Sequence, residues 1–148
     1  MTLADQLTTD LHAAMKSGDS KTRDVLRFAI TAVKNETVSA GHELNDDETE
    51  AVLARLKKQL DQAASEYESL GNSERATDEA EQSTIIARYL PAPLTDKELS
   101  AEVSAAVEAT AATSSAQMGL VIQAVKARVG NRADGGRIAT LVKEALTK

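Results

Sequence analysis

The sequence lacks cysteine and has few aromatic residues. Without cysteine, the 148-residue chain has no disulfide, no thiolate metal site and no thiol nucleophile. Its aromatic residues are Phe28, Tyr67 and Tyr89, so the core must consist largely of aliphatic side chains and alanine, which suit closely packed helices. No segment approaches the run of about 18 apolar residues of a transmembrane helix, and the N-terminus does not resemble a signal peptide. We therefore expect a cytoplasmic protein with no membrane partner.

Patterns of catalytic and metal-binding residues are also missing. The two histidines, His12 and His42, are expected to be solvated, and no HExxH-type spacing is present. The acidic run at 45–50 lacks the central glycine of an EF-hand and favours the start of a helix. We expect no catalytic residue, no metal, no cofactor and no intrinsic enzymatic activity.

Apolar residues recur at helical spacing along the whole chain, and no stretch alternates with a period of two. This pattern predicts an all-α protein. Four longer helices are expected first: one ending before Gly18, one capped by Asp19 or Ser20 and ending near Gly41, one capped by Asn45 and ending at Gly71, and one over roughly 74–90.

The two prolines mark the expected domain boundary. Pro91 and Pro93 lie together and break the helical pattern, and Thr95 with Glu98 then opens a new capping box. We expect an N-terminal helical bundle over 1–90 and a small three-helix domain over 91–148. The apolar stripes of its helices are Leu99, Val103, Ala106 and Val107; Met118, Val121, Ile122, Val125 and Val129; and Ile138, Leu141, Val142, Ala145 and Leu146.

Charge is unevenly distributed between these two parts. Residues 1–90 hold 17 acidic and 10 basic side chains, a net charge of −7, whereas residues 91–148 hold 6 acidic and 7 basic ones, a net charge of +1. Residues 117–148 hold six basic and two acidic side chains, a net charge of +4. This uneven charge, acidic in the first part and basic near the C-terminus, bears on which partners the chain binds and not on its fold.

The glycine-rich stretch "RVGNRADGGR" (128–137) lies inside the basic segment. It lacks the spacing, the following Lys-Ser/Thr and the preceding strand of a Walker loop. A helix corner is one interpretation, with Gly130 ending one helix and Asn131 or Asp134 capping the next. A contact surface is the other, because Gly135 and Gly136 in the first turn would let another backbone come close to exposed amides.

The basic residues around this corner suggest an RNA contact. Solubilising charge is the alternative explanation for them. Because aromatics are scarce, base stacking is hardly available, and contact would be with the phosphates of a folded RNA. The candidate RNA-binding residues are Lys126, Arg128, Arg132, Gly135, Gly136, Arg137 and Lys143.

Four segments in order along the chain carry a family resemblance. "RDVLRFAITAVKNE" (23–36), "IIARYLPAPLTDKEL" (85–99), "QMGLVIQAV" (117–125) and "GNRADGGRIATLVKEAL" (130–146) resemble the motifs of the GatB/YqeY group. That group is named for the B subunit of the glutamine-dependent tRNA amidotransferase and its free-standing relative.

The resemblance implies an N-terminal helical bundle followed by a three-helix domain similar to the tRNA-holding tail of that subunit. It associates the chain with a carbon–nitrogen ligase that uses glutamine as amido donor, although the catalytic machinery of that enzyme is absent from these residues. The leading hypothesis is a non-catalytic accessory protein associated with tRNA or other RNA through its basic C-terminal domain. The alternative is a protein–protein interaction module without an RNA role, which would bind other proteins through the N-terminal bundle.

Overall fold

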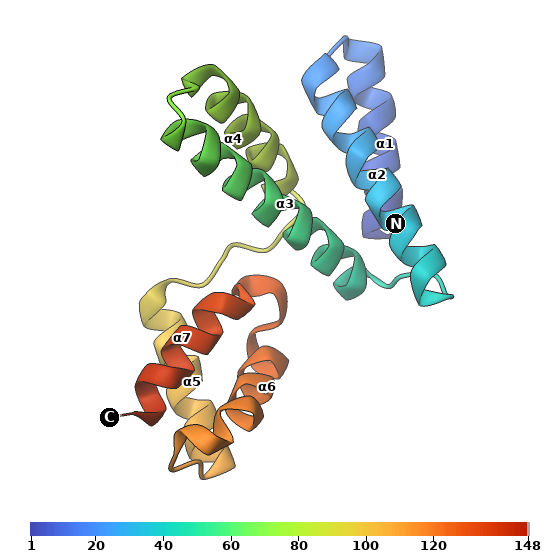
Figure 1. Ribbon diagram of the computed structural model, residues 1–148. Helices are drawn as coiled ribbons and strands as arrows, with labels where there is room; N and C mark the ends of the chain where they lie inside the picture. Colours follow the sequence, from blue (N-terminus) through green and yellow to red (C-terminus); the bar gives the residue numbers. More distant parts are fainter. Residues whose placement is uncertain (148) are drawn as a thin grey trace. The chain divides into compact units, whose positions relative to one another are not determined.

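The computed structural model describes residues 1–147, and every regular element among them is helical, which confirms the all-α prediction (Figure 1). The chain divides into two compact units, Met1–Leu90 and Pro91–Lys148. The α-helices are α1 (Leu3–Ser17), α2 (Ser20–Ala40), α3 (Asp46–Ser69), α4 (Ser73–Ala87), α5 (Asp96–Thr110), α6 (Met118–Val129) and α7 (Gly135–Leu146).

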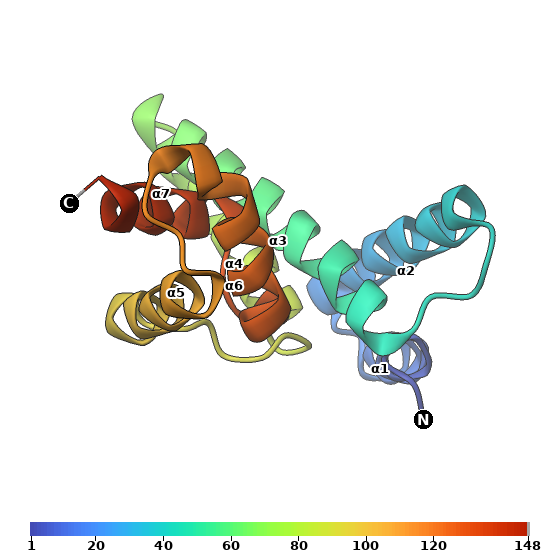
Figure 2. The ribbon, with the colours of Figure 1, turned by 90° about the horizontal axis from the view of Figure 1, so that it is seen from below.

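The first unit consists of two helical hairpins. Helix α1 packs along α2, and α3 packs along α4 (Figures 1 and 2). The hairpins share an aliphatic core whose fully buried large side chains include Leu7, Leu26, Leu53 and Ile86. Burial of each such side chain stabilises the fold by about 1.5–3 kcal/mol, so this unit needs no aromatic core.

Polar side chains also join the two hairpins. The Asp46 carboxylate accepts a hydrogen bond from the Leu3 backbone N–H at 3.0 Å. At the other end of the unit the Tyr89 hydroxyl donates to Asp10 at 2.6 Å. Burial raises the pKa of Tyr89 far above its usual value, and the bond to the Asp10 carboxylate raises it further. This phenol therefore stays protonated and keeps its donor.

The helix starts agree with the predicted caps. Asp19 accepts from the Thr22 backbone N–H at 3.1 Å, and reciprocal capping boxes form at Asn45 and at Thr95. In the second box Glu98 accepts from the Thr95 backbone N–H at 3.0 Å, and that bond is the main cause of a lowered Glu98 pKa. Each cap satisfies an amide that a helix N-terminus leaves unpaired.

Helix α4 ends at Ala87, earlier than the expected position near 90. Residues 88–90 form tighter turns, in which the Leu90 N–H bonds to the Ala87 carbonyl at 3.2 Å. Pro91 explains the change, because the residue before a proline is disfavoured in helical geometry.

The second unit is built from α5, α6 and α7 around its own core, which includes Leu99, Val103, Val125, Ile138 and Val142. Two 3-10 turns that were not predicted, η1 (Ser115–Gln117) and η2 (Gly130–Arg132), flank α6. No helix in residues 1–147 is long and apolar enough to cross a membrane.

Candidate nucleic-acid interface

The glycine-rich stretch forms the corner between α6 and α7. Gly130 follows Val129, the last residue of α6, as predicted, and has a positive φ of 58°, but its ψ of −132° lies outside the left-handed helical region in which a glycine commonly ends a helix. Asp134 holds the N-cap position of α7 with extended backbone, as one of the two predicted caps, although its side chain accepts no capping hydrogen bond. The corner therefore relies on backbone geometry more than on a side-chain cap.

Gly136 makes room for a side chain of the same chain, whereas a Cβ at Gly135 would make only ordinary contacts. A Cβ at Gly135 would lie 3.8 Å from Cε and Nζ of Lys126, so this lysine lies beside the first turn of α7. A Cβ at Gly136 would lie 3.0 Å from the Asp134 carboxylate, which is closer than ordinary van der Waals contact. The ammonium of Lys126 and the carboxylate of Asp134 thus both lie close to this helix N-terminus.

Arg137 holds the segment after the prolines against this corner. Its Nη2 donates to the Leu94 carbonyl at 3.1 Å and to the Asp96 carboxylate at 2.6 Å. The Leu94 backbone N–H donates to the Arg132 carbonyl at 2.8 Å, and the Leu94 side chain is buried in the core of the second unit. Arg137 therefore has a structural partner on each side of the Thr95 cap.

The other two arginines also have partners within the chain. Nε of Arg128 donates to Glu102 of α5 at 2.7 Å, and Nε of Arg132 donates to the Ala92 carbonyl at 3.4 Å. Arg128 and Arg132 are exposed, and Arg137 is half-buried. Arg132 and Arg137 thus share the 92–96 segment, while Arg128 is bound to the α5 surface.

The two candidate lysines differ from the arginines. Lys126 and Lys143 are exposed and form no salt bridge among residues 1–147. They lie in the last turns of α6 and α7, where a positive charge interacts favourably with the helix dipole. The seven candidates therefore do not form one cluster: Lys126 lies beside Gly135, and Lys143 lies at the opposite end of α7.

Comparison with protein families gives one clear result. Residues 4–146 match the family described as Yqey-like protein. The chain belongs to the YqeY-like family. The match covers nearly the whole chain, and it confirms the resemblance that the four sequence segments indicated. No curated protein matches the sequence.

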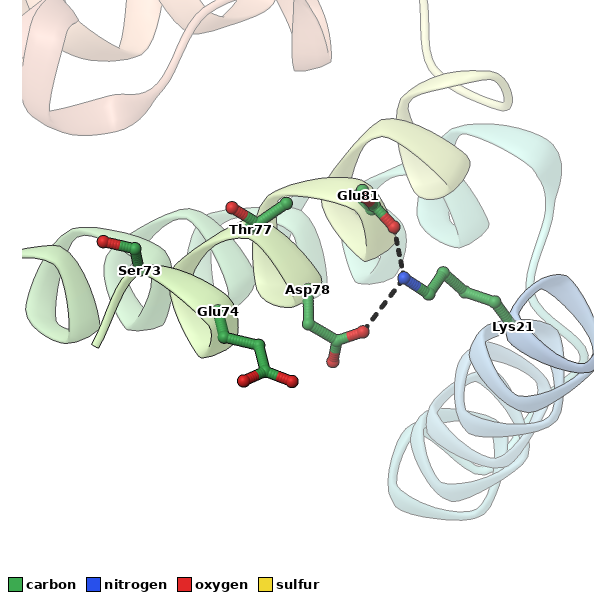
Figure 3. Close-up of a pocket in the computed structure, with 6 residues that line it drawn as sticks. All are labelled: Lys21, Ser73, Glu74, Thr77, Asp78 and Glu81. Carbon is green, nitrogen blue, oxygen red and sulfur yellow. Dashed lines mark hydrogen bonds and ion pairs between the residues drawn. The ribbon is translucent and has the colours of Figure 1, made fainter.

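The YqeY-like chain also has a hollow lined by polar residues on its first unit, which was not expected from the sequence. It has a volume of about 450 Å³ and is lined by Lys21 of α2 and by residues of α4 (Figure 3). Lys21 extends toward α4, with Nζ 3.0 Å from Asp78 and paired also with Glu81. The hydrogen bonds from Lys21 to these two carboxylates raise its pKa, and the bond to Glu81 has the larger effect. The ammonium therefore links α2 to α4. With three carboxylates and one ammonium in its lining, the hollow does not favour phosphate. Its lining residues are Lys21, Ser73, Glu74, Thr77, Asp78 and Glu81.

A second feature absent from the sequence prediction is the solvent-facing side of α2. Phe28, one of the few aromatic residues of this YqeY-like chain, is 64% exposed there, and Val38 is 82% exposed. The remaining aromatic residues are half-buried. The Arg75 guanidinium lies over the Tyr67 ring, and the Tyr89 hydroxyl is hydrogen-bonded to Asp10. The spacing of residues along α2 was a visible signal, but the exposure of Phe28 follows only from the packing.

Proposed function

We propose that the protein is a cytoplasmic, non-catalytic accessory protein that binds folded RNA, and tRNA in particular, through the basic surface of its second unit. The observation that carries this proposal is the segregation of charge: net +4 over 117–148 in a chain of net −6. Such a surface attracts a phosphate backbone, and each phosphate contact makes the affinity more dependent on salt.

The two exposed lysines are the simplest phosphate contacts. Among residues 1–147, neither Lys126 nor Lys143 is paired with a carboxylate that it would have to release before binding a phosphate. Arg128 and Arg137 already bind Glu102 and Asp96. The charges of these two arginines add to the positive surface potential, but each guanidinium would divide its N–H donors between the RNA and its partner within the protein.

A salt series of tRNA binding tests the proposal. We expect the wild type to bind folded tRNA at low salt, with an affinity that falls steeply as salt rises. Replacing Lys126 and Lys143 by alanine should lower the slope of log affinity against log salt by up to about 1.5 without affecting the fold. The variant Arg128→Ala/Arg132→Ala/Arg137→Ala should also lower the slope, accompanied by a loss of stability.

Lys97→Ala is the matched control, since Lys97 is an exposed lysine of α5 outside the basic segment. It should leave the slope close to that of the wild type. Absence of binding at low salt, or an equal effect of Lys97→Ala and the Lys126 and Lys143 substitutions, would contradict the proposal.

A link to the glutamine-dependent tRNA amidotransferase is a further part of this proposal, and it is supported by the resemblance of the three-helix domain over 91–148 to the tail of that enzyme's B subunit. If the protein assists amidation, its addition to purified amidotransferase subunits will change the rate of glutamine-dependent amidation of mischarged tRNA. An unchanged rate would remove this link and leave the binding proposal to the salt series.

The alternative function, a protein–protein interaction module, is favoured by a separate observation. The first unit exposes Phe28 and Val38 on one face of α2, and a solvated helix face does not require either residue. A pull-down with and without ribonuclease separates the two functions, because partners held through RNA will be lost on digestion.

A further inference from the structure

The outward face of α2 has the residue spacing of a coiled-coil seam. Phe28, Thr31, Asn35 and Val38 follow one another at intervals of three, four and three residues, and all four are exposed. At about 100° per residue they lie within an arc of about 80° on one side of the helix. In heptad terms Phe28 and Asn35 occupy a positions, and Thr31 and Val38 occupy d positions.

This seam is opposite the face that α2 packs into its own unit. Val25, Leu26, Ala29 and Val33 are buried in the core, so the helix is held in place without any contribution from the seam. The Thr31 hydroxyl donates to the Arg27 carbonyl at 2.9 Å and is satisfied within the helix. A partner helix would therefore cover the Thr31 methyl group without leaving an unpaired donor.

Two basic side chains flank the seam on one side. Arg27 and Lys34, seven residues apart, occupy the two g positions, and neither forms a salt bridge among residues 1–147. The Arg27 guanidinium lies 4.0 Å from the sulfur of Met15 on α1, which is 49% exposed and extends the apolar surface. Asp24 lies seven residues before Thr31, at a d position of the seam itself, and its carboxylate is paired with Arg23 at 2.9 Å.

From this arrangement we propose that the α2 seam binds an acidic amphipathic helix of another protein. Apolar residues of the partner would cover Phe28 and Val38, and its flanking carboxylates would face Arg27 and Lys34. Charges at such flanking positions set the choice of partner in coiled coils, and a polar residue such as Asn35 at an a position sets the register. The inference concerns the first unit and does not rest on RNA binding by the second.

Charge argues against a second copy of this chain as the occupant. Antiparallel pairing of two α2 seams would bring Arg27 and Lys34 of the two copies together, which is repulsive. Parallel pairing would place them against the e positions, Ala32 and Ser39, which carry no charge. A partner with carboxylates at these positions has neither disadvantage.

RNA fits this face less well than a helix does. Val38 is a fully aliphatic side chain at one end of the seam, and a phosphate backbone offers it nothing to pack against. A helix with an apolar seam covers Val38 and Phe28 together.

Two designed helical peptides test the inference with the full-length protein. Both carry leucine and isoleucine at a and d positions; one has glutamate at every e and g position, and the other has lysine there. Fluorescence anisotropy should show that the acidic peptide binds at least tenfold more tightly than the basic one. The variant Arg27→Glu/Lys34→Glu should reverse this preference, and Lys97→Glu should leave it unchanged.

The apolar part of the seam has its own variant. Phe28→Ala should weaken binding of the acidic peptide at least tenfold while leaving the thermal melting curve in place, since Phe28 is outside the core. Leu70→Ala is the matched control, because Leu70 is 79% exposed at the turn after α3. It should not change the affinity.

Disulfide crosslinking locates the bound peptide, and because the chain has no native cysteine, only the introduced cysteine can react. Thr31→Cys should form a disulfide with an acidic peptide that carries one cysteine at a d position. Thr77→Cys, an exposed position on α4, should not.

Four results would overturn the inference. The first is a failure of the acidic peptide to bind, and the second is equal binding of both peptides. The third is a preference that survives the charge swap. The fourth is a loss of self-association or of tRNA binding in Phe28→Ala with no loss of peptide binding, because it would assign the seam to a second copy or to RNA.

Discussion

The guanidinium of Arg137 donates a hydrogen bond to the backbone carbonyl of Leu94, 3.1 Å away, and thereby joins the start of α7 to the segment that follows the prolines. The same Nη2 contacts Asp96, whose side chain is 88% exposed. The two bonds contribute unequally to the free energy of unfolding. An exposed ion pair contributes little, whereas a hydrogen bond from a charged donor to a partly buried carbonyl contributes more.

Arg137→Ala should therefore destabilise the second unit by about 1.5–3 kcal/mol, since it leaves the Leu94 carbonyl without this charged donor. Asp96→Ala should cost less, about 0.5–1 kcal/mol, through the exposed ion pair and the helix dipole. Urea unfolding followed by circular dichroism measures both. Equal losses for the two variants would show that the ion pair, and not the carbonyl bond, holds the segment.

Tyr89→Phe should alter the response of the first unit to alkaline pH. The Tyr89 pKa is raised in the folded state, mainly by burial and then by its bond to Asp10, so its stabilising contribution is complete below the ordinary tyrosine pKa of about 10. That contribution is lost as pH rises above this value toward the folded-state pKa. The variant should cost about 1 kcal/mol at neutral pH and show a smaller alkaline loss than the wild type.

Thermal melts of the two proteins between pH 8 and pH 11 make this comparison. Tyr67→Phe controls for removing a tyrosine hydroxyl elsewhere in the same unit. Parallel alkaline losses in wild type and Tyr89→Phe would contradict the assignment to Tyr89.

Ala111→Gly should stabilise the second unit. Ala111 ends α5 in the left-handed conformation, with φ 55° and ψ 30°, and it is the one non-glycine residue with positive φ in the described chain. A side chain in this conformation costs roughly 1–2 kcal/mol, and glycine recovers that strain against a smaller loss of backbone entropy. The expected net gain is about 0.5–1 kcal/mol in urea unfolding. Ala101→Gly, inside α5, should instead cost about 1 kcal/mol.

Lys21→Ala should weaken the tie between α2 and α4 only slightly. All three partners in the Lys21, Asp78 and Glu81 cluster are more than a third exposed, so the loss should be at most about 1 kcal/mol. The difference from wild type should shrink between low and high salt, because exposed charges are screened. A loss that is larger and independent of salt would mean that the aliphatic part of Lys21, not its charge, is what matters.

Local features of this chain could be predicted from the sequence, and tertiary ones could not. Helix starts at Asp19, Asn45 and Thr95 depend on residues within four positions, and the helical stripes depend on a short repeat; both were predicted correctly. The 3-10 turn at 130–132 and the early end of α4 depend on how the chain leaves each helix, and they were missed or misplaced.

The candidate site shows the same division. The basic residues could be identified from composition alone, but the partner of Arg137 is a backbone carbonyl 43 positions away, and that of Arg132 is one 40 positions away. Carbonyl acceptors carry no signature in the sequence. The spacing along α2 was visible, whereas only packing of the opposite face shows that Phe28 remains in solvent.

The partners of the three arginines have a consequence for recognition. A free arginine side chain carries about 2 kcal/mol of rotamer entropy, which a new contact must overcome. Arg128 and Arg137 have already lost part of this freedom to Glu102, Leu94 and Asp96, yet a guanidinium has five N–H donors and these bonds leave several unused. Guanidiniums that are already held in place bind two phosphates only when the distance between the phosphates matches the distance between the guanidiniums. They would therefore distinguish a rigid fold from a flexible strand of equal charge.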